Sequence, residues 1–350
     1  MKSILKLLIY VILASVILFA FFLGYSTIAD YKPTPIELLS QAKGDVVDVN
    51  DTLKVFNWNI GYCGLGDDMS FFYDGGEKVR TSKKRTQENI AGILDVIKAH
   101  QTFDFLLFQE VDISSRRSYK TNQSDLIMNA LEGYHKNLAI NYKVTFVPVP
   151  PSNPMGKVNG GIAAFSKFEP FDVTRHSFLG NYAWPKGLFM LDRCFMVQRY
   201  NTSDGKQLLV VNTHNEAYDT GFLRKEQMKM LKEFLLEEYK NGNYIMVGGD
   251  WNQNPPIPGE ESTVSTEGHL TRIRIASDFM PEGWQWIYSS TIPTNRMIDK
   301  AYDIKTSETT VIDFFLLSPN LNKVTSEAID LQFKNSDHNP VILSFKFVAN

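Results

Sequence analysis

The stretch 245–255, IMVGGDWNQNP, has a carboxylate and three amides after a run of apolar and small residues. A short apolar run that ends in glycine predicts a buried strand, which we place at Tyr244–Gly248. Asp250 and Asn252 follow where that strand ends, so the sheet would hold both side chains at its edge. The chain repeats this arrangement, and the repeated strand ends predict both the fold and the site.

Five further strand ends carry a carboxylate, an amide or an imidazole. Each alone has an ordinary explanation, such as turn chemistry or a solvated strand end. A carboxylate within an apolar strand is less ordinary, because a buried charge needs a partner. Six such ends in one chain are improbable by chance, so we expect them to converge. The added residues are Asn59 in VFNWNI (55–60), Glu110 in FLLFQE (105–110), His214 in LVVNTH (209–214), Asp313 in IDFFLL (312–317), and Asp337 with His338 in SDHNP (336–340).

These residue types suit metal-assisted hydrolysis of a phosphoester. Carboxylate and amide oxygens are the hard ligands that Mg²⁺ or Mn²⁺ prefers. A divalent cation neutralises phosphate charge and stabilises the leaving oxygen. One histidine would take a proton from water while a carboxylate orients its ring, and the other would contact a phosphate oxygen.

The remainder of the chain after residue 50 alternates short apolar runs with two amphipathic segments. Apolar residues at helical spacing predict helices at Lys83–Ala99 and Phe222–Tyr239. With no internal repeat or long linker, residues 51–350 are expected to form one α/β domain of stacked sheets. The other predicted strands are Leu53–Ile60, Phe103–Phe108, Val144–Val147, Gly161–Ser166, Cys194–Tyr200, Gln207–Thr213, Val311–Leu317 and Val341–Val348.

The motifs, in chain order over residues 51–348, resemble the endonuclease/exonuclease/phosphatase superfamily of DNase I-like phosphoesterases. They are FNWNIG, LLFQEVD, VVNTH, VGGDWNQNP, VIDFFLL and SDHNPV. A GDxN followed much later by SDHxPV is a specific pair. The resemblance implies an α/β fold that is a four-layer sandwich of two mainly antiparallel sheets flanked by helices.

The resemblance also implies a role for each matching residue. Glu110 would be the principal Mg²⁺ ligand, with Asp337 close to the metal. Asn59 would contact phosphate or the metal, and Asp250 and Asn252 would orient water and phosphate or bind a second metal. His338 would be the general base, with Asp313 fixing its tautomer. His214 would stabilise the transition state.

Further residues are candidates for substrate binding. Asp192 is a candidate partner for His214, and Arg193 beside it a candidate phosphate contact, although a surface ion pair explains both equally well. Arg116, with Arg117 and Ser118 after it, follows the Glu110 strand and is a candidate for binding substrate anions. The substrate stays open among nucleic acid, phospholipid and sugar or inositol phosphate. No long basic loop of the kind that grips a duplex is evident, and nothing calls for an obligate protein partner.

The first residues indicate export. Lys2 and Lys6 precede an uncharged run, Leu7–Gly24, which as a helix would span about 27 Å at ~1.5 Å per residue. Residues 1–28 are therefore either an uncleaved signal-anchor helix, which the length favours, or a signal peptide removed after export. The two lysines predict a cytoplasmic N-terminus and an exported domain, membrane-anchored or, after cleavage, secreted or periplasmic. Pro33, Pro35 and polar neighbours predict a tether over residues 29–50.

Composition excludes several classes. With 350 residues, 43% hydrophobic and 21% charged, the chain is not collagen-like, low-complexity or wholly disordered. A net charge of -3 argues against coating nucleic acid by charge alone. Cys63 and Cys194 allow at most one disulfide, and the sequence leaves that pairing open. A non-catalytic surface binding module is the alternative to an enzyme, which the intact Glu110, Asp250 and His338 disfavour.

Overall fold

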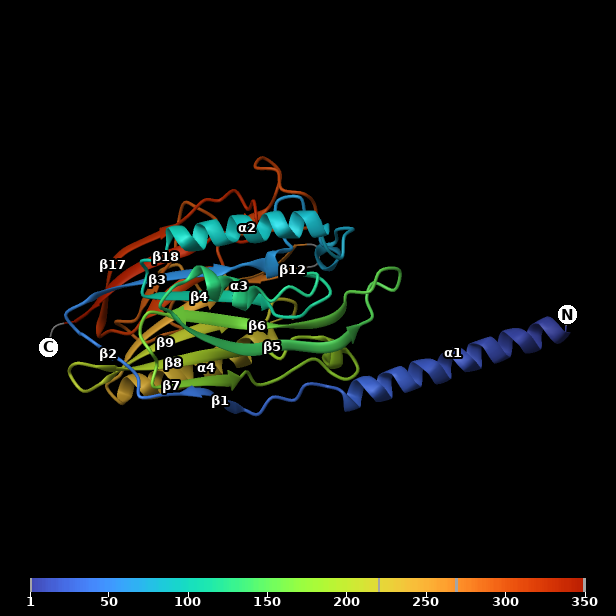
Figure 1. Cartoon of the computed structure of the whole chain (residues 1–350), viewed down its shortest axis with the longest axis horizontal. Helices are drawn as coiled ribbons and strands as arrows, with labels where there is room; N and C mark the ends of the chain where they lie inside the picture. Colours follow the sequence, from blue (N-terminus) through green and yellow to red (C-terminus); the bar gives the residue numbers. More distant parts are fainter. Residues whose placement is uncertain (1, 220, 268–269, 349–350) are drawn as a thin grey trace.

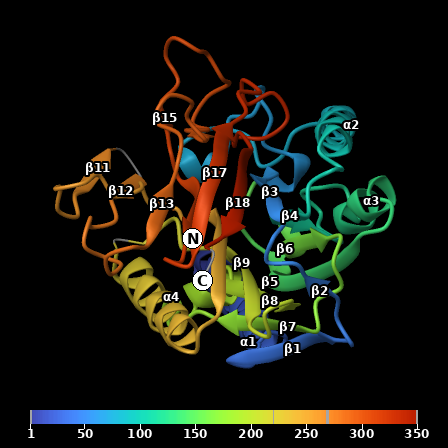
Figure 2. The same cartoon turned by 90° about the vertical axis from the view of Figure 1, so that its left-hand side faces the viewer.

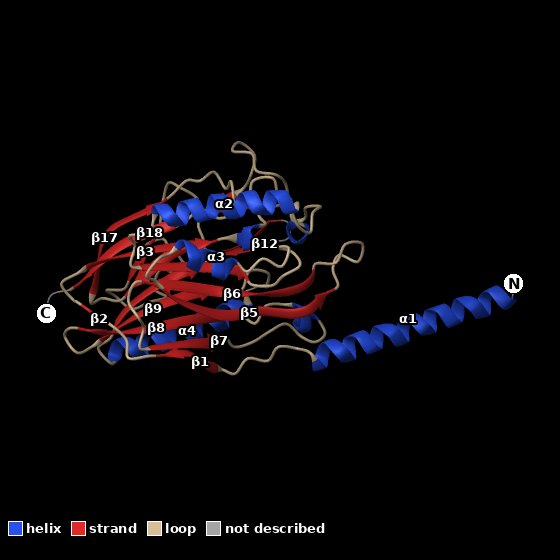
Figure 3. Ribbon diagram, in the orientation of Figure 1, coloured by secondary structure: helices blue, strands red, loops and turns tan. Residues whose placement is uncertain are grey.

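In the computed structural model, residues 2–219, 221–267 and 270–348 are described. Two mixed sheets pack face to face, with helices on both outer faces, and a long N-terminal helix projects from one end (Figures 1 and 3). The predicted four-layer sandwich is confirmed. Most neighbouring strands are antiparallel, and the parallel pairs are β2–β8, β3–β4 and β9–β10.

The six-stranded sheet has the order β17-β18-β3-β4-β6-β5, and the eight-stranded sheet has the order β1-β7-β8-β9-β10-β16-β13, with β2 beside β8. Figure 2 shows the two sheets from the end opposite the N-terminal helix. Two short ribbons, β11–β12 and β14–β15, lie outside the sheets. The strands are β1 (Ile36–Gln41), β2 (Val46–Val47), β3 (Thr52–Asn59), β4 (Phe105–Asp112), β5 (His135–Val147), β6 (Gly156–Ser166), β7 (Asp172–Ser177), β8 (Cys194–Thr202), β9 (Gln207–His214), β10 (Tyr244–Asp250), β11 (Val264–Glu267), β12 (Leu270–Ile273), β13 (Gln285–Ile287), β14 (Asn295–Arg296), β15 (Thr309–Thr310), β16 (Asp313–Leu317), β17 (Leu321–Ala328) and β18 (Val341–Phe347).

The pleat of each strand separates the core into layers. Val210 of β9 and Met246 of β10 belong to the cluster between the sheets, whereas Val211 and Val247 pack outward beneath α4. Such alternation follows from the two-residue period of a strand. On the other outer face, α2 and α3 cover the six-stranded sheet. The helices are α1 (Lys2–Ile28), α2 (Lys83–Ala99), α3 (Gln123–Ala130) and α4 (Phe222–Lys240), with short 3-10 turns at Gly61–Cys63, Phe72–Asp74 and Lys186–Phe189.

The segment 29–50 differs from the expected free tether. Its strand β1 pairs antiparallel with β7, and β2 pairs parallel with β8, so this part of the chain is built into the edge of the eight-stranded sheet. Pro33 and Pro35 precede β1, so they prevent a helix there but leave the backbone N–H groups of Ile36–Gln41 free to pair with β7 at the sheet edge. The folded domain therefore includes residues 36–47, which lie within the predicted tether.

Helix α1 has 27 residues, carries its side chains largely exposed, and is long and apolar enough by length and composition to cross a membrane. This agrees with the predicted N-terminal membrane helix and leaves signal anchor and signal sequence both open. Cys63 and Cys194 are buried free thiols, so they do not form a disulfide.

Candidate active site

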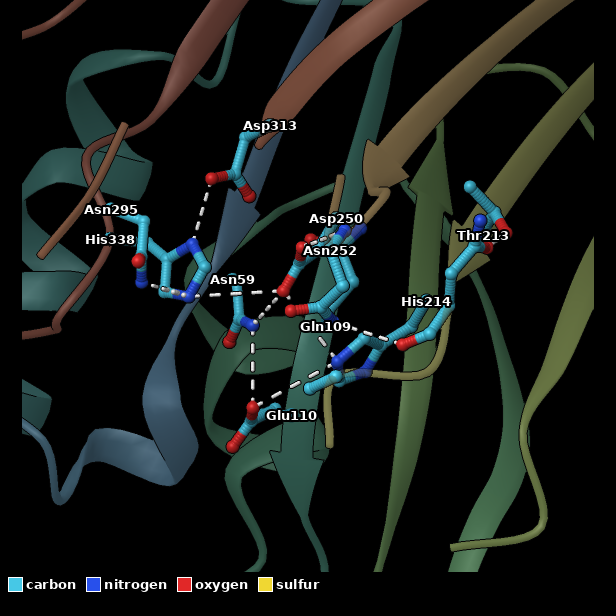
Figure 4. Close-up of polar contacts among 12 residues, drawn as sticks. Asn59, Gln109, Glu110, Thr213, His214, Asp250, Asn252, Asn295, Asp313 and His338 are labelled. Carbon is cyan, nitrogen blue, oxygen red and sulfur yellow. Dashed lines mark hydrogen bonds and ion pairs between the residues drawn. The ribbon is translucent and has the colours of Figure 1, made fainter. Parts of the chain in front are cut away.

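The pleat brings the predicted side chains from both sheets into the space between them. Asn59 continues the inward face of β3, and His214 and Asp250 continue the inward faces of β9 and β10. Asp313 begins β16 and stands opposite Asp250 in the antiparallel register. All four lie at one end of the sandwich, where Figure 4 shows their polar groups converging.

Glu110 reaches the same point by a different route. Two residues of β4, Gln109 and Glu110, oppose one residue of β6, because the register shifts between Phe108 and Val111. Glu110 has φ 53°, a left-handed conformation that is uncommon for a non-glycine residue. A bulge re-aims side chains at functional sites. It turns the Glu110 carboxylate, which would otherwise face outward, into the cleft.

His338 is fixed by contacts on both ring nitrogens and on its backbone. Nδ1 lies 2.7 Å from Asp313 Oδ2, and Nε2 lies 3.0 Å from Asn295 Nδ2. The indole of Trp58 donates to the His338 carbonyl at 2.8 Å. Nε2 also lies 3.8 Å from Asp250 Oδ2. The imidazole therefore has one edge on Asp313 and presents the other to the cleft.

Asn59 joins the two sheets at the centre of the cluster. Its Nδ2 donates to Asp250 Oδ2 at 2.9 Å and to Glu110 Oε1 at 3.4 Å, and its Oδ1 accepts from Gly61 N–H at 3.0 Å. One lone pair of the Asn59 oxygen is used by the backbone, and metal binding by Asn59 stays a prediction. The amide is oriented as a donor, which suits a phosphate oxygen. Gly61 has φ 48°, and a Cβ there would meet Asp337 Oδ1 at 2.7 Å, so the turn requires glycine.

The acidic groups lack sufficient counter-charge within the described residues. Burial, followed by the charge of Asp313, raises the pKa of Asp250 to about 6. Burial and the nearby Glu110 raise the pKa of Asp337 to about 6. Although burial opposes it, the carboxylates of Asp313 and Asp337 hold the pKa of His338 well above its usual range. Burial disfavours the charged form of these carboxyl groups, and a bound cation would stabilise that form.

The donor set fits a hard divalent cation. Glu110 and Asp337 supply carboxylate oxygens at the cleft, and ligand atoms of Asp250, Asp313 and His338 lie within 4.8 Å of one another. Asp313 already binds His338, so within that second group Asp250 is the carboxylate left for a cation. Oxygen donors with no cysteine among them match Mg²⁺ or Mn²⁺.

His214 lies within the cluster, but its expected partner does not. Nε2 is 3.6 Å from Asp250 Oδ2 and 4.0 Å from Glu110 Oε1, while the buried Nδ1 has no hydrogen-bond partner among the described residues. Burial and the charge of Arg193 lower the pKa of His214 well below its usual range, so the ring is neutral. Asp192 is not among the described residues that line the cleft, and its backbone oxygen accepts from Arg175. Asp192 lies in the segment just before β8, and no hydrogen bond or ion pair joins it to His214 among the described residues.

The two predicted arginines have different positions. Arg193 is 6% exposed and lines the cleft; its Nε lies 3.4 Å from Glu216 Oε2, and its buried Nη1 has no hydrogen-bond partner among the described residues. A desolvated cation with an unused donor suits an anionic ligand. Arg116 is exposed and bonds the Pro154 carbonyl, so it does not line the cleft. Its neighbour Arg117 does, held by Asp112 and stacked 3.8 Å from the centre of the Tyr62 ring.

Further residues support the site or line the cleft. Gln109, inside the quoted QE motif, donates 2.8 Å to Asn57 Oδ1 and 2.7 Å to Asn212 Oδ1, which ties the sheets together directly beneath the site. Asn295, on the short ribbon β14, was not predicted. Asn252 holds its place through a 2.9 Å bond from its N–H to Asp250 Oδ1 and another from Nδ2 to the Asn215 carbonyl. One wall of the cleft is aromatic, formed by Tyr62, Phe71, Tyr73, Tyr142 and Tyr218.

Comparisons with known proteins agree with this geometry. Solved structures with the same fold include an endonuclease/exonuclease/phosphatase from Beutenbergia cavernae DSM 12333 (15% identity, 85% of this chain and 72% of that chain, TM-score 0.53), truncated Caenorhabditis elegans TDP2 (16%, 86% and 100%, 0.52) and ANGEL2, described as a 2′,3′-cyclic phosphatase (16%, 87% and 98%, 0.51). No curated protein sequence matches the chain. A sequence profile of the Endonuclease/Exonuclease/phosphatase family matches residues 56–338, which span every cluster residue described above. The chain belongs to the endonuclease/exonuclease/phosphatase family.

Proposed function

We propose that this protein is a divalent-metal-dependent hydrolase that cleaves a phosphoester by direct attack of water. The observation that carries the proposal is the convergence of Glu110, Asp250 and Asp337 with two histidines on one cleft that also holds the unpaired donor of Arg193. Membership of the family supports phosphoester hydrolysis as the reaction class. A non-catalytic binding module would have no use for an oriented Asp313–His338 pair.

Mg²⁺ or Mn²⁺ held by Glu110 and Asp337, with Asp250 beside them, would neutralise charge on the phosphate and on the leaving oxygen. A cation beside Asp337 and Asp250 would offset two of the charges that raise the pKa of His338, and its Nε2, which faces the cleft, could then accept a proton from the attacking water while Asp313 keeps Nδ1 protonated.

The remaining polar groups bind the phosphate. Arg193 Nη1 is an unpaired donor among the described residues, and His214 Nε2 lies beside Asp250 on the same cleft, 3.6 Å from its Oδ2. Just behind them, Asn59 Nδ2 donates to Asp250 and Glu110. These groups would stabilise the phosphoryl oxygens as negative charge develops on them. Asn252 holds the turn after β10 in place, with its backbone on Asp250.

We propose that α1 is an uncleaved signal anchor, with the catalytic domain exported from the cytoplasm. Its most apolar stretch has no cover within the described residues, and the first strand of the domain, β1, begins at Ile36, a few residues after the helix ends at Ile28. The membrane is thus a partner of the protein through α1.

A substrate panel tests the reaction class. The full chain in detergent, supplied with Mn²⁺, is incubated with bis-p-nitrophenyl phosphate, p-nitrophenyl phosphate, single-stranded DNA, RNA and inositol phosphates, in parallel with His338→Ala. We expect turnover of at least one phosphoester, with the variant reduced by roughly 10²–10⁴-fold. If the wild type and His338→Ala release product at the same rate on every substrate, the proposed reaction is wrong.

A further inference from the structure

Exposed apolar side chains gather at the end of the domain from which α1 projects. Phe146 at the end of β5 is 39% exposed, Leu179 61%, Trp184 63% and Phe222 69%. The chain neighbours of Leu179 and Phe222 lie side by side, since a Cβ at Gly180 would meet the Leu223 side chain at 2.9 Å. We refer to Phe146, Leu179, Trp184 and Phe222 together as the apolar rim.

Helix α1 contacts the domain at this rim. The ring of Phe22 stacks on Phe189 with centroids 5.8 Å apart, and lies edge-on to Phe146 at 6.1 Å. The indole of Trp184 donates to Thr27 Oγ1 at 3.2 Å. Phe22 lies inside the uncharged run Leu7–Gly24, so the domain residues that touch it lie at the level where that run ends.

The same rim is continuous with the wall of the active cleft. The carbonyl of Phe189 accepts a 2.9 Å hydrogen bond from Tyr142, and both Tyr142 and Met190 line the cleft. Tyr182, two residues before Trp184, donates to Glu216, the ion-pair partner of Arg193. Strands β3 and β4 point toward the end of the molecule that bears α1 in Figure 1. The opening of the cleft and the exit of the helix therefore share one end.

We propose that the rim formed by Phe146, Leu179, Trp184 and Phe222 is a membrane-contact surface, seated in the outer layer of the same bilayer that α1 spans. Apolar and aromatic side chains at the lipid–water boundary, with Trp prominent among them, are the chemistry that such a boundary accepts. Lys143 and Lys186, both exposed beside this end, add positive charge that suits phosphate headgroups. A rim seated in the bilayer holds the cleft at the membrane surface, so the substrates of the enzyme are phosphoesters carried by lipids. The choice of substrate rests on the proposed function, whereas the contact surface does not.

Depth-dependent quenching tests the surface. The full chain is reconstituted in phosphatidylcholine vesicles, with NBD attached to Leu179→Cys, Trp184→Cys or Phe222→Cys, one variant at a time. The native thiols of Cys63 and Cys194 are 2% and 0% exposed and do not compete for label. Val46→Cys, an apolar position that is 60% exposed on β2 at the opposite end of the domain, is the matched control.

We expect nitroxide-labelled phosphatidylcholine to quench the three rim labels several-fold more than the Val46 label. Quenching no greater than at Val46 overturns the proposal. A blue shift of the NBD emission of the rim labels without quenching by lipid also overturns it, because contact between two copies of the chain would give that result.

A second arm separates the surface from the reaction. Leu179→Ser with Trp184→Ser should slow release of water-soluble phosphoester from vesicles of phosphatidylcholine, sphingomyelin and phosphatidylinositol at least several-fold, and should leave hydrolysis of bis-p-nitrophenyl phosphate unchanged. Hydrolysis of the soluble ester with no attack on vesicle lipid by the wild type overturns the lipid substrate. Failure on both substrates contradicts the proposed function, and the quenching result then decides the contact surface alone.

Discussion

His338 has a defined orientation because each part of the residue is held by a different element. Asp313 of β16 binds one ring nitrogen, Asn295 of β14 lies against the other, and Trp58 of β3 holds the carbonyl. A general base must keep its reactive nitrogen aimed at the attacking water, and the second nitrogen sets the tautomer. The imidazole and Asp313 therefore act as one unit.

A double-mutant cycle tests this unit. His338→Ala should lower kcat for bis-p-nitrophenyl phosphate by roughly 10²–10⁴-fold, and Asp313→Asn should lower it by no more than that. Because residues that act together are not additive, the double variant should be no slower than His338→Ala alone. Asp278→Asn, at an exposed position, is the matched control and should retain full activity. Multiplication of the two single effects in the double variant would show that the residues act separately.

Sequence reasoning at this scale succeeded where a side chain follows the pleat. Asn59, His214, Asp250 and Asp313 lie where strand periodicity puts them. It could not place residues in loops: of Asp192 and Arg193, which precede β8, only Arg193 lines the cleft. Of the adjacent candidates Arg116 and Arg117, which follow β4, only Arg117 does.

The bulge in β4 is the element that brings Glu110 into the proposed metal site. It lets Gln109 point between the sheets while Glu110, the next residue, points into the cleft, which a regular strand forbids. Gln109 then holds Asn57 and Asn212 from both sheets. The bulge could not be predicted from FLLFQE, because register depends on partner strands that are distant in sequence.

Replacing Gln109 tests how much this cross-link contributes. Gln109→Leu leaves the buried amide oxygens of Asn57 and Asn212 without their donor, so the free energy of unfolding should fall by about 1–3 kcal/mol. Urea unfolding of the full chain in detergent, followed by tryptophan fluorescence, measures it. Gln101→Leu, at an exposed glutamine, should change the free energy by no more than ~0.5 kcal/mol. Equal effects of the two substitutions would mean that the amide network is not a stabilising link.

Helices and strands with clear periodicity were predicted closely. The predicted helix Lys83–Ala99 is confirmed with the same bounds, and Phe222–Tyr239 ends one residue short. The short helix α3 was missed, since eight residues carry only two turns of periodicity. Strand β1 lies within the predicted tether. An edge strand forms by pairing with one neighbour, here β7, and the local sequence does not reveal that neighbour.

The whole molecule is a sandwich whose candidate site residues lie at the end from which α1, the candidate membrane span, projects. Two sheets packed face to face carry all of the cluster at the ends of β3, β4, β9 and β10, with Asp313 and His338 entering from the strands beside them. This arrangement collects residues from nearly the entire chain and surrounds them with a low-dielectric core, which makes their charges interact strongly. A bound divalent cation is the central claim, since it is what allows these carboxylates to stay close together.

Metal-dependent turnover tests that claim most directly. Hydrolysis of bis-p-nitrophenyl phosphate by the full chain is measured before EDTA, after EDTA, and after titration with Mn²⁺, in the wild type, Glu110→Gln and the exposed control Glu132→Gln. We predict that EDTA abolishes turnover and that Mn²⁺ restores it in the wild type and in Glu132→Gln. Glu110→Gln should need at least ~10-fold more Mn²⁺, because even the loss of an outer hydrogen-bond partner costs roughly 10–100-fold in metal affinity. Turnover that is unchanged by EDTA, or a Glu110→Gln titration that superimposes on the wild type, would contradict it.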